Sequence, residues 1–415
     1  MKRLLIIVIF FIAIAHAKAQ NTMSLDSVLS VIEKNNPVVQ MYNADIRSMD
    51  EAAKGAKSWM PPELGTGLYM TPYNPFLWKR SVNGTNGMGQ YMISAQQMIP
   101  NKKELEANEK YMQAQSTVSK ESEQSAINEL YAAAKNSYYN WLISEKKMLV
   151  LDDNEKLLSF MIQSAELRYK NNLGKLNAYY KAKAALGKIE NQRVVILNEI
   201  NQQRIRLNTL MNREKTTGFS IDTLYVVRSY EKVDSGYFSH ARSDIKAIDK
   251  NIDLAYLQQS LERSKLKLQF GVRYDHMFGF GGVPMQYTLM AMVKFPMAGW
   301  SSKSYKANIE SLKWKAASYA EQRQMIINEA SGEVIGLIAA IASKKMQLQL
   351  FEENIIPSLH KNFKTTQLGY EQNTEELFEL FDAWETLNMT QLDYLDQLQE
   401  LLNMQVQMDK ILEQK

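Results

Sequence analysis

The sequence predicts a mainly α-helical chain with a small β part, arranged as two copies of one structural unit. Of the 9 prolines, none lies between Pro100 and Pro284, and glycine is almost absent from residues 90–210. The stretches without helix breakers are therefore longer than the roughly 8–20 residues of an ordinary globular helix. Segment 90–100 also resembles segment 286–296, and short segments with alternating apolar residues occur in pairs at equivalent places in the two halves. These three observations predict the fold class.

Composition excludes several classes of protein. Hydrophobic residues make up 45% and charged residues 23% of the 415 residues, which is a globular ratio rather than a disordered one. An α/β nucleotide-binding fold needs frequent glycine-rich turns, and these are missing over 90–210. The chain has no Cys and only 4 His, which excludes disulfides and thiolate zinc sites. A net charge of +4 is too small an excess to indicate a nucleic-acid partner.

Residues 1–19 are predicted to be a secretory signal peptide. Two cations precede an apolar run from Leu4 to about Ala15, and Ala17-Lys18-Ala19 supplies a small-x-small cleavage site. The run is shorter than the ~20 residues that cross a bilayer as a helix, and no later apolar run reaches that length. We therefore expect an exported protein without a transmembrane helix. An N-terminal membrane anchor is the alternative.

The chain is internally duplicated. Gln-Tyr, Ala and Pro of segment 90–100 recur in the same register 196 residues further on, in segment 286–296. Segment 168–173 likewise resembles segment 369–374. We divide the chain into a first repeat over 20–212, a connector over 213–240 and a second repeat over 241–415. Each repeat is expected to contain a helix, a strand pair and a long helical hairpin.

The strand pairs are predicted at 65–73 and 88–98 and at 267–278 and 285–295. Alternation with period two separates an apolar face from a polar face. The polar face would carry Met92, Met98, Arg273, Asp275, Met277, Met290, Met292 and Lys294. A lipid-facing apolar side and a polar lumen fit this pattern at roughly 9–11 residues per strand. Since four strands cannot close a barrel and lipid tolerates no open sheet edge, several copies of the chain must share one barrel.

Long helices are predicted to follow each strand pair, over 102–167 and 302–366. Apolar residues recur at three- and four-residue spacing in the first of them and in the last helix, which is typical of coiled-coil packing. Gly332, Gly336 and Pro357 predict a bend or break in the second long helix. In the connector, Leu224-Tyr225-Val226-Val227 predicts one short strand.

With its parts in this order, the sequence resembles the outer-membrane efflux protein family, the TolC-like exit ducts of tripartite pumps. The heavy-metal efflux branch of this family is one candidate for the resemblance. Leu25-Asp26-Ser27-Val28-Leu29, followed by Asn35-Asn36-Pro37, is similar to the family's amino-terminal helix motif. Segments 168–178 and 369–382 resemble its hairpin turns. The resemblance implies a homotrimer in which each chain gives four strands to a shared 12-stranded β-barrel, with a long α-helical coiled-coil periplasmic tunnel. It implies as partners a periplasmic adaptor protein, an inner-membrane RND-type or ABC transporter, and outer-membrane lipid.

The hairpin turns depart from the family pattern. Asn172 and Asn373 stand where the family has glycine, and asparagine is the other residue that best tolerates positive φ. The charges around the two turns have opposite signs, basic at Lys175 and Lys181, and acidic at Glu375, Glu376, Glu379 and Asp382. The resemblance places Glu379 and Asp382 at the family's periplasmic constriction. We hypothesise that ion pairs between alternating hairpins hold this entrance shut; a solvated charged helix face is the alternative.

No catalytic constellation is visible, so neither an enzyme nor a cofactor is expected. The methionines of the polar face suggest export of copper or silver, because thioethers prefer soft cations such as Cu(I). Apolar filling is the alternative role for them. The predicted function is the outer-membrane exit channel of a tripartite efflux pump, a passive conduit for drugs or heavy-metal cations. The alternative is a non-conducting periplasmic coiled-coil adaptor or scaffold.

Overall fold

The computed structural model describes residues 22–79, 84, 87–172 and 176–415, so the predicted signal peptide lies outside the described residues. The chain divides into two compact units. The first comprises the described residues up to Met41 together with 124–242 and 327–415, and the second comprises 42–123 and 243–326. Each unit therefore contains segments from both halves of the sequence.

Short elements open the described chain. Strand β1 (Thr22–Met23) precedes helix α2 (Leu25–Asn35). The Ser24 hydroxyl oxygen caps α2 by accepting a hydrogen bond from the Ser27 backbone N–H at 3.3 Å. Helix α2 buries the apolar residues that recur at helical spacing, Val28, Leu29 and Ile32. Helix α3 (Pro37–Lys54) begins with a proline, whose missing N–H costs no bond at that position.

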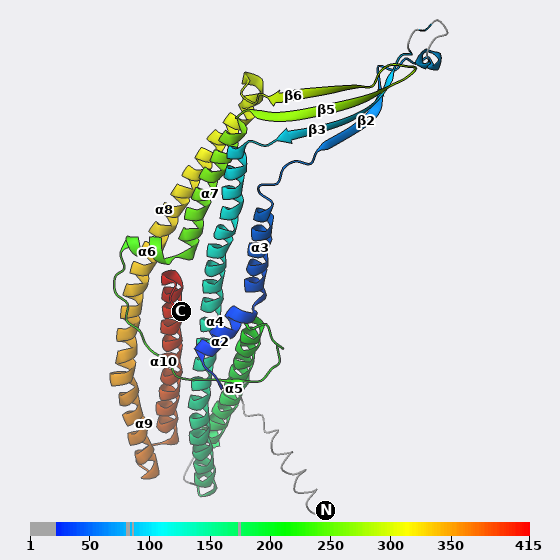
Figure 1. Cartoon of the computed structure of the whole chain (residues 1–415). Coiled ribbons are helices and arrows are strands. Elements are labelled where there is room, and N and C mark those ends of the chain that lie inside the picture. Colours follow the sequence, from blue (N-terminus) through cyan, green and yellow to red (C-terminus); the bar gives the residue numbers. More distant parts are fainter. Residues whose placement is uncertain (1–21, 80–83, 85–86, 173–175) are drawn as a thin grey trace, which may run out of the picture. The chain divides into compact units, whose positions relative to one another are not determined.

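The predicted long helices are present. Helix α4 (Lys102–Lys170) has 69 residues, which corresponds to about 100 Å at the helical rise of about 1.5 Å per residue. Helix α5 (Leu176–Leu210) completes the first hairpin. Helix α8 (Gly299–Leu350) continues through a π-helical turn (Phe351–Ile355) into α9 (Ile356–Glu371), and α10 (Leu377–Leu412) completes the second hairpin (Figure 1).

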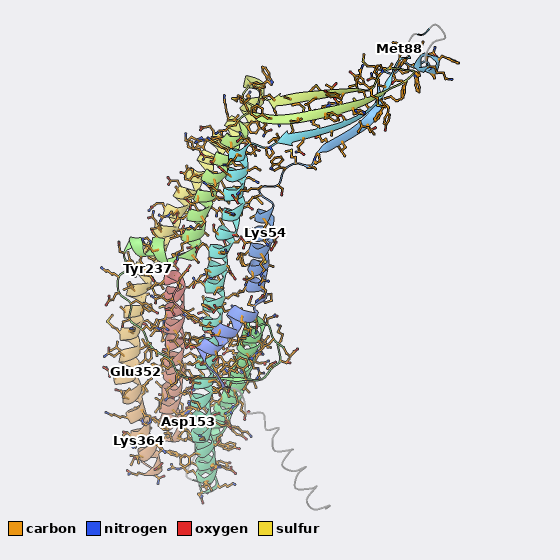
Figure 2. All side chains as sticks on the ribbon, viewed as in Figure 1. Lys54, Met88, Asp153, Tyr237, Glu352 and Lys364 are labelled. Carbon is orange, nitrogen blue, oxygen red and sulfur yellow. The ribbon has the colours of Figure 1, made fainter. Side chains whose placement is uncertain are left out.

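The expected interruption of the second long helix was partly wrong. Helix α8 runs through Gly332 and Gly336 without a break, because a glycine costs only about 1 kcal/mol relative to alanine in a helix. The irregularity occurs just before Pro357, where the Ile356 N–H bonds the Phe351 carbonyl five residues back instead of four. Glu352, labelled in Figure 2, lies in this turn and accepts a hydrogen bond from the Tyr394 hydroxyl at 2.5 Å.

Four helices share one apolar core within the first unit. It contains Leu158 and Met161 from α4 and Ile189 from α5, together with Phe363 from α9 and Trp384 from α10. The Trp384 indole N–H donates to the side-chain oxygen of the buried Asn154 at 2.7 Å. The stripes of apolar residues predicted from three- and four-residue spacing thus pack the two hairpins of one chain together.

The connector contains a strand at a different place from the one predicted. Residues 224–227 form no strand; β4 is Ser220–Ile221, which pairs in parallel with β1. The Tyr138 hydroxyl on α4 fixes this pair by donating to the Asp222 carbonyl at 2.8 Å, and burial raises the pKa of Tyr138 to about 12. The short helix α6 (Ser235–Ala241) follows, and the Tyr237 hydroxyl donates to the Leu412 carbonyl at 3.1 Å (Figure 2).

A buried charge cluster ties the connector to α4 and α10. The Lys135 ammonium lies 2.6 Å from the Asp409 carboxylate, and the two side chains are only 3% and 6% exposed. From the connector, Arg228 and Tyr230 donate to the same carboxylate at 3.2 and 3.0 Å. The Gln414 carbonyl accepts a second bond from Lys135 at 3.1 Å.

The four strands of the second unit form one antiparallel sheet in the order β2-β3-β5-β6 (Figure 1). They are β2 (Glu63–Tyr69), β3 (Gln90–Ile99), β5 (Gln269–Gly279) and β6 (Gln286–Lys294), and helix α7 (Ser243–Lys265) precedes β5. A short 3-10 helix (Pro75–Trp78) lies between β2 and β3. The two predicted strand pairs are therefore present, although the first strand covers 63–69 rather than the predicted 65–73. The two pairs join through β3 and β5. In the described chain, β2 and β6 pair on one side only.

One described helical stretch, Gly299–Glu371, has a window long and apolar enough to cross a membrane by length and composition alone. The expectation that no later segment reaches this limit is therefore wrong by that criterion. Only 22% of the window is buried inside the chain. Core helices of soluble proteins pass the same test.

Candidate functional site: the four-stranded sheet and the hairpin tips

The register of the sheet places its residues on two unlike faces. We call residues that lie opposite one another on β3, β5 and β6 a row. One row holds Met92, Met277 and Gln286, and the next holds Ser94, Asp275 and Thr288. Two further rows on the same face hold Gln96, Arg273 and Met290, and then Met98, Gly271 and Met292. This is the polar face predicted from alternation, and it carries every residue assigned to it, including Lys294 opposite Gln269.

One pair of opposite charges lies on the polar face. Arg273 donates to the Asp275 carboxylate at 2.9 Å, and the carboxylate side chain is only 5% exposed. Both side chains belong to β5, two residues apart, so strand geometry alone brings them to one face. The Gln90 amide donates to the Gln286 side-chain oxygen at 3.2 Å. This bond joins two residues that are equivalent in the two repeats.

A glycine lets two thioethers converge on the polar face. Gly271 is buried between Met98 of β3 and Met292 of β6. A Cβ added at residue 271 would lie 2.5 Å from Met98 Sδ and 2.9 Å from Met292 Cε. Both methionine side chains therefore fold over the glycine into the space that any other residue would fill. Met92 and Met277 form a second pair, directly opposite each other on β3 and β5.

The opposite face is apolar and exposed in the single chain. It presents large side chains from all four strands, including Leu68, Ile93, Phe270, Tyr287, Leu289 and Val293. His276 also lies on this face, stacked on Tyr274 and edge-on to Phe278, without a carboxylate partner among the described residues. Exposing an apolar surface of this kind to water is unfavourable in free energy. We therefore expect lipid or another protein to cover this face.

The two hairpin turns share the backbone conformation of one asparagine each. Asn172 and Asn373 have φ values of 58° and 61°, the left-handed conformation expected when asparagine replaces glycine. The Asn172 N–H bonds the Tyr169 carbonyl at 3.0 Å, and the Asn373 N–H bonds the Tyr370 carbonyl at 3.2 Å. The repeats therefore match in hydrogen bonding as well as in sequence at this point.

The acidic residues assigned to the tip lie at the start of α10. Glu375, Glu376, Glu379 and Asp382 are all exposed. Lys175 lies outside the described residues. Within the part of the tip that the structure describes, no ion pair joins Glu379 or Asp382 to a lysine or arginine. Lys170 instead pairs with Glu166 of its own helix at 2.7 Å, and this hydrogen bond lowers the pKa of Glu166.

Cation–π contacts link the two hairpins within one chain. The Lys181 ammonium lies 4.0 Å from the Phe378 ring centroid and 4.2 Å from that of Phe381. The Arg168 guanidinium lies 3.9 Å from the Tyr370 ring centroid and also donates to the Tyr370 carbonyl. We call these contacts the cation–π contacts of the tip. Sequence reasoning considered only charges here and overlooked the rings; Phe378 and Phe381, three residues apart, were the available signal.

Solved structures of outer-membrane channels share this fold. The outer-membrane channel OprN superposes with a TM-score of 0.76 at 13% identity, over 94% of this chain and 90% of that one. A structure of CusC, described in terms of transmembrane channel formation, gives 0.75 at 12% identity over 94% and 91%. The outer membrane protein VceC of Vibrio cholerae gives 0.72 at 14% identity over 94% and 95%. No family model matches the sequence, and no curated protein matches it significantly.

Proposed function

We propose, from the premise that the chain has the TolC-like fold of these outer-membrane channels, that it forms the outer-membrane exit channel of a tripartite efflux pump. The protein lies in the outer membrane with a large periplasmic helical part. It acts as a passive conduit, and an inner-membrane RND-type or ABC transporter drives export through a periplasmic adaptor. The cargo is a drug or a heavy-metal cation.

The observation that carries this proposal is the sheet with two unlike faces and two unpaired edges. Its exposed apolar face fits lipid, and its polar face, with the Arg273–Asp275 pair at 2.9 Å, fits a water-filled lumen. Among the described residues neither edge strand has a partner on its outer side, and lipid cannot supply the missing hydrogen bonds. Copies of the chain supply them by joining their sheets into one barrel.

An apolar stripe on α8 supports assembly into a homotrimer. In the first unit, Ala330, Val334, Ile341 and Leu348 form the buried side of this helix. A second stripe at helical spacing is exposed in the single chain, formed by Gly332, Ile335, Gly336, Ala339, Ala342, Met346 and Leu350. Apart from the helix's own neighbouring backbone, no described atom lies within 4 Å of a Cβ built at Gly332 or Gly336, so a neighbouring helix can approach closely there. Since joined sheets bring copies side by side, we assign this stripe to contacts between them.

A non-conducting periplasmic scaffold is the competing function. Coiled-coil hairpins suit a scaffold equally well, but a scaffold in water has no use for an exposed apolar sheet face. Single-channel recording in planar bilayers separates the two functions. We expect the purified protein to migrate as a heat-sensitive oligomer and to give discrete conductance steps. A freely soluble monomer without conductance would contradict the proposal.

Two adjacent residues of β6 provide a matched pair of variants. Leu289 on the apolar face is 66% exposed, and Met290 on the polar face lies opposite Arg273. L289D places a charge against lipid and should reduce insertion, since a charge on the lipid face costs up to about 2–4 kcal/mol for Lys or Arg at the bilayer midplane and less for Asp. M290D places the same charge beside a cation and should insert normally. Equal insertion of both variants would refute the assignment of faces.

The acidic residues at the tip are proposed to act at the periplasmic entrance. Glu379 and Asp382 are exposed on the first turns of α10, where they can meet cations of neighbouring chains. Each exposed pair is worth only about 0–1 kcal/mol, so several must act together. The double variant Glu379→Ala, Asp382→Ala should raise conductance and lower cation selectivity. Glu190→Ala on α5 serves as the control, and unchanged conductance in the double variant would discard this role.

A further inference from the structure

We propose that Met98 and Met292, folded over Gly271, form a binding site for a soft monovalent cation such as Cu(I) or Ag(I) on the polar face of the sheet. The proposal rests on the proposed function, in which this face lines the conduit. It names the cargo class as heavy-metal cations and places the contact at one pair of residues.

The geometry of this site depends on a residue without a side chain. Met98 Sδ and Met292 Cε approach the same point above Gly271, within 2.5 and 2.9 Å of it, from the strands on either side. In an ordinary sheet a side chain on the central strand would separate these two methionines. Here the Cβ position of the central strand is empty, and the sulfur of Met98 and the methyl carbon of Met292 both reach into it from non-adjacent strands.

The chemistry of the surroundings selects the cation. Among the residues that the structure describes, no group of three or more His, Cys, Asp or Glu side chains is placed to hold a metal. Hard cations therefore find no cluster of carboxylates among these residues, whereas thioethers bind Cu(I) and its analogue Ag(I). Two cationic side chains lie in the adjoining rows of this face. Arg273 is held by Asp275 at 2.9 Å, so its charge is compensated. Lys294 is exposed, so its ammonium can extend into water away from the site.

The arrangement also suits transit rather than storage. Met98 and Met292 are half-buried, so a bound cation remains open to exchange. Met290, the next residue on this face of β6, is 40% exposed and is available as a third thioether. The Met92–Met277 pair lies three rows further along the same face. Weak sites in series along a conduit let a cation enter and leave, as conduction requires.

Silver binding to the purified oligomer tests the site directly. The probe is silver nitrate in chloride-free detergent buffer, measured by equilibrium dialysis with metal analysis and by calorimetry. The double variant Met98→Leu, Met292→Leu removes both sulfurs at nearly constant volume. The matched control Met285→Leu, Met297→Leu removes two exposed methionines that flank β6 outside the pair. We expect the site variant, and not the control, to lose one equivalent of Ag(I) per chain.

A third variant separates geometry from sulfur content. Gly271→Ala keeps every methionine but inserts a methyl group between them, and it should weaken binding of Ag(I) as well. Equal silver binding by the wild type, the site variant and the control would overturn the proposal, and so would a wild type that binds no silver. Conductance is recorded for each sample. Loss of silver binding with intact conductance leaves the channel function standing, whereas silver binding without conductance in the wild type refutes the channel function alone.

Discussion

Removing the Asp409 carboxylate should strongly destabilise the first unit of the chain. In the variant Asp409→Leu, the Lys135 ammonium stays 3% exposed and keeps only the Gln414 carbonyl as a partner. Breaking a buried ion pair by removing one member costs about 3–5 kcal/mol, because an uncompensated charge remains buried. Arg228 suffers less, since its side chain is 42% exposed and can turn to water.

The magnitude converts into a measurable shift. At about 2–4 °C per kcal/mol for a large domain, the thermal midpoint should fall by about 6–20 °C. Circular dichroism at 222 nm, at fixed protein and detergent concentration, records it. Asp153→Leu is the control, because Asp153 pairs with Lys156 while both side chains are 76% exposed; its midpoint should not change.

A double variant tests the reason as well as the effect. Lys135→Met combined with Asp409→Leu removes both buried charges, and such replacements are often neutral or stabilising. We therefore expect the midpoint to return close to that of the wild type. If Asp409→Leu leaves the midpoint unchanged, or if the double variant is as unstable as the single one, the burial argument is wrong.

Three other changes have expected outcomes. Ile335, 61% exposed in the single chain, should contact a neighbouring copy, so I335D should yield monomers in detergent by light scattering while Q349E, on the same helix, should not. Lys181→Gln should speed amide exchange at the second hairpin turn by up to about fivefold, since a cation–π contact is worth about 0.5–1 kcal/mol; the exposed Lys183→Gln should not. The hydrogen bond from Tyr131 at 2.6 Å, and then Lys415, lower the pKa of Glu33. Because the pKa of Glu33 is lower in the folded state, its carboxylate stabilises the fold at pH values above the ordinary pKa near 4.5. This contribution to the free energy of unfolding is lost as the pH falls below that value and through the lowered pKa. The acid-induced drop in midpoint between pH 6 and 3 should therefore be smaller in Tyr131→Phe, and an identical drop would refute the assignment.

Local sequence signals predicted the parts of the fold that depend on local chemistry. Alternation is clear in three of the four predicted strands, where one face is apolar, and all four are present, although the first was placed at 65–73 instead of 63–69. The hairpin turns at Asn172 and Asn373 follow from backbone sterics. The break predicted at Gly332 and Gly336 is absent, because packing along the buried side of α8 outweighs the small local cost of glycine in a helix. The strand expected at 224–227 lacks a partner, whereas Ser220–Ile221 pairs with the distant β1.

The candidate sites depended more on contacts across the chain. The polar face was predictable residue by residue, but the convergence of Met98 and Met292 depends on a three-strand register that no single strand reveals. At the tip, charge signs suggested ion pairs, yet Lys181 rests on the Phe378 and Phe381 rings. Aromatic faces attract cations without carrying a formal charge, so a reading of charges alone overlooks them.

The edges of the sheet also constrain how copies assemble. Strands β2 and β6 are different surfaces, so an edge pairing of β2 with β6 of another copy is head-to-tail rather than two-fold symmetric. Because the four strands alternate in direction, such a pairing continues the antiparallel pattern without interruption. Head-to-tail contacts close into rings when the rotation per copy fits, and each ring contains a multiple of four strands. Two copies would give an eight-stranded barrel, and side chains nearly fill the interior of a barrel of that size. A conduit therefore needs at least three copies.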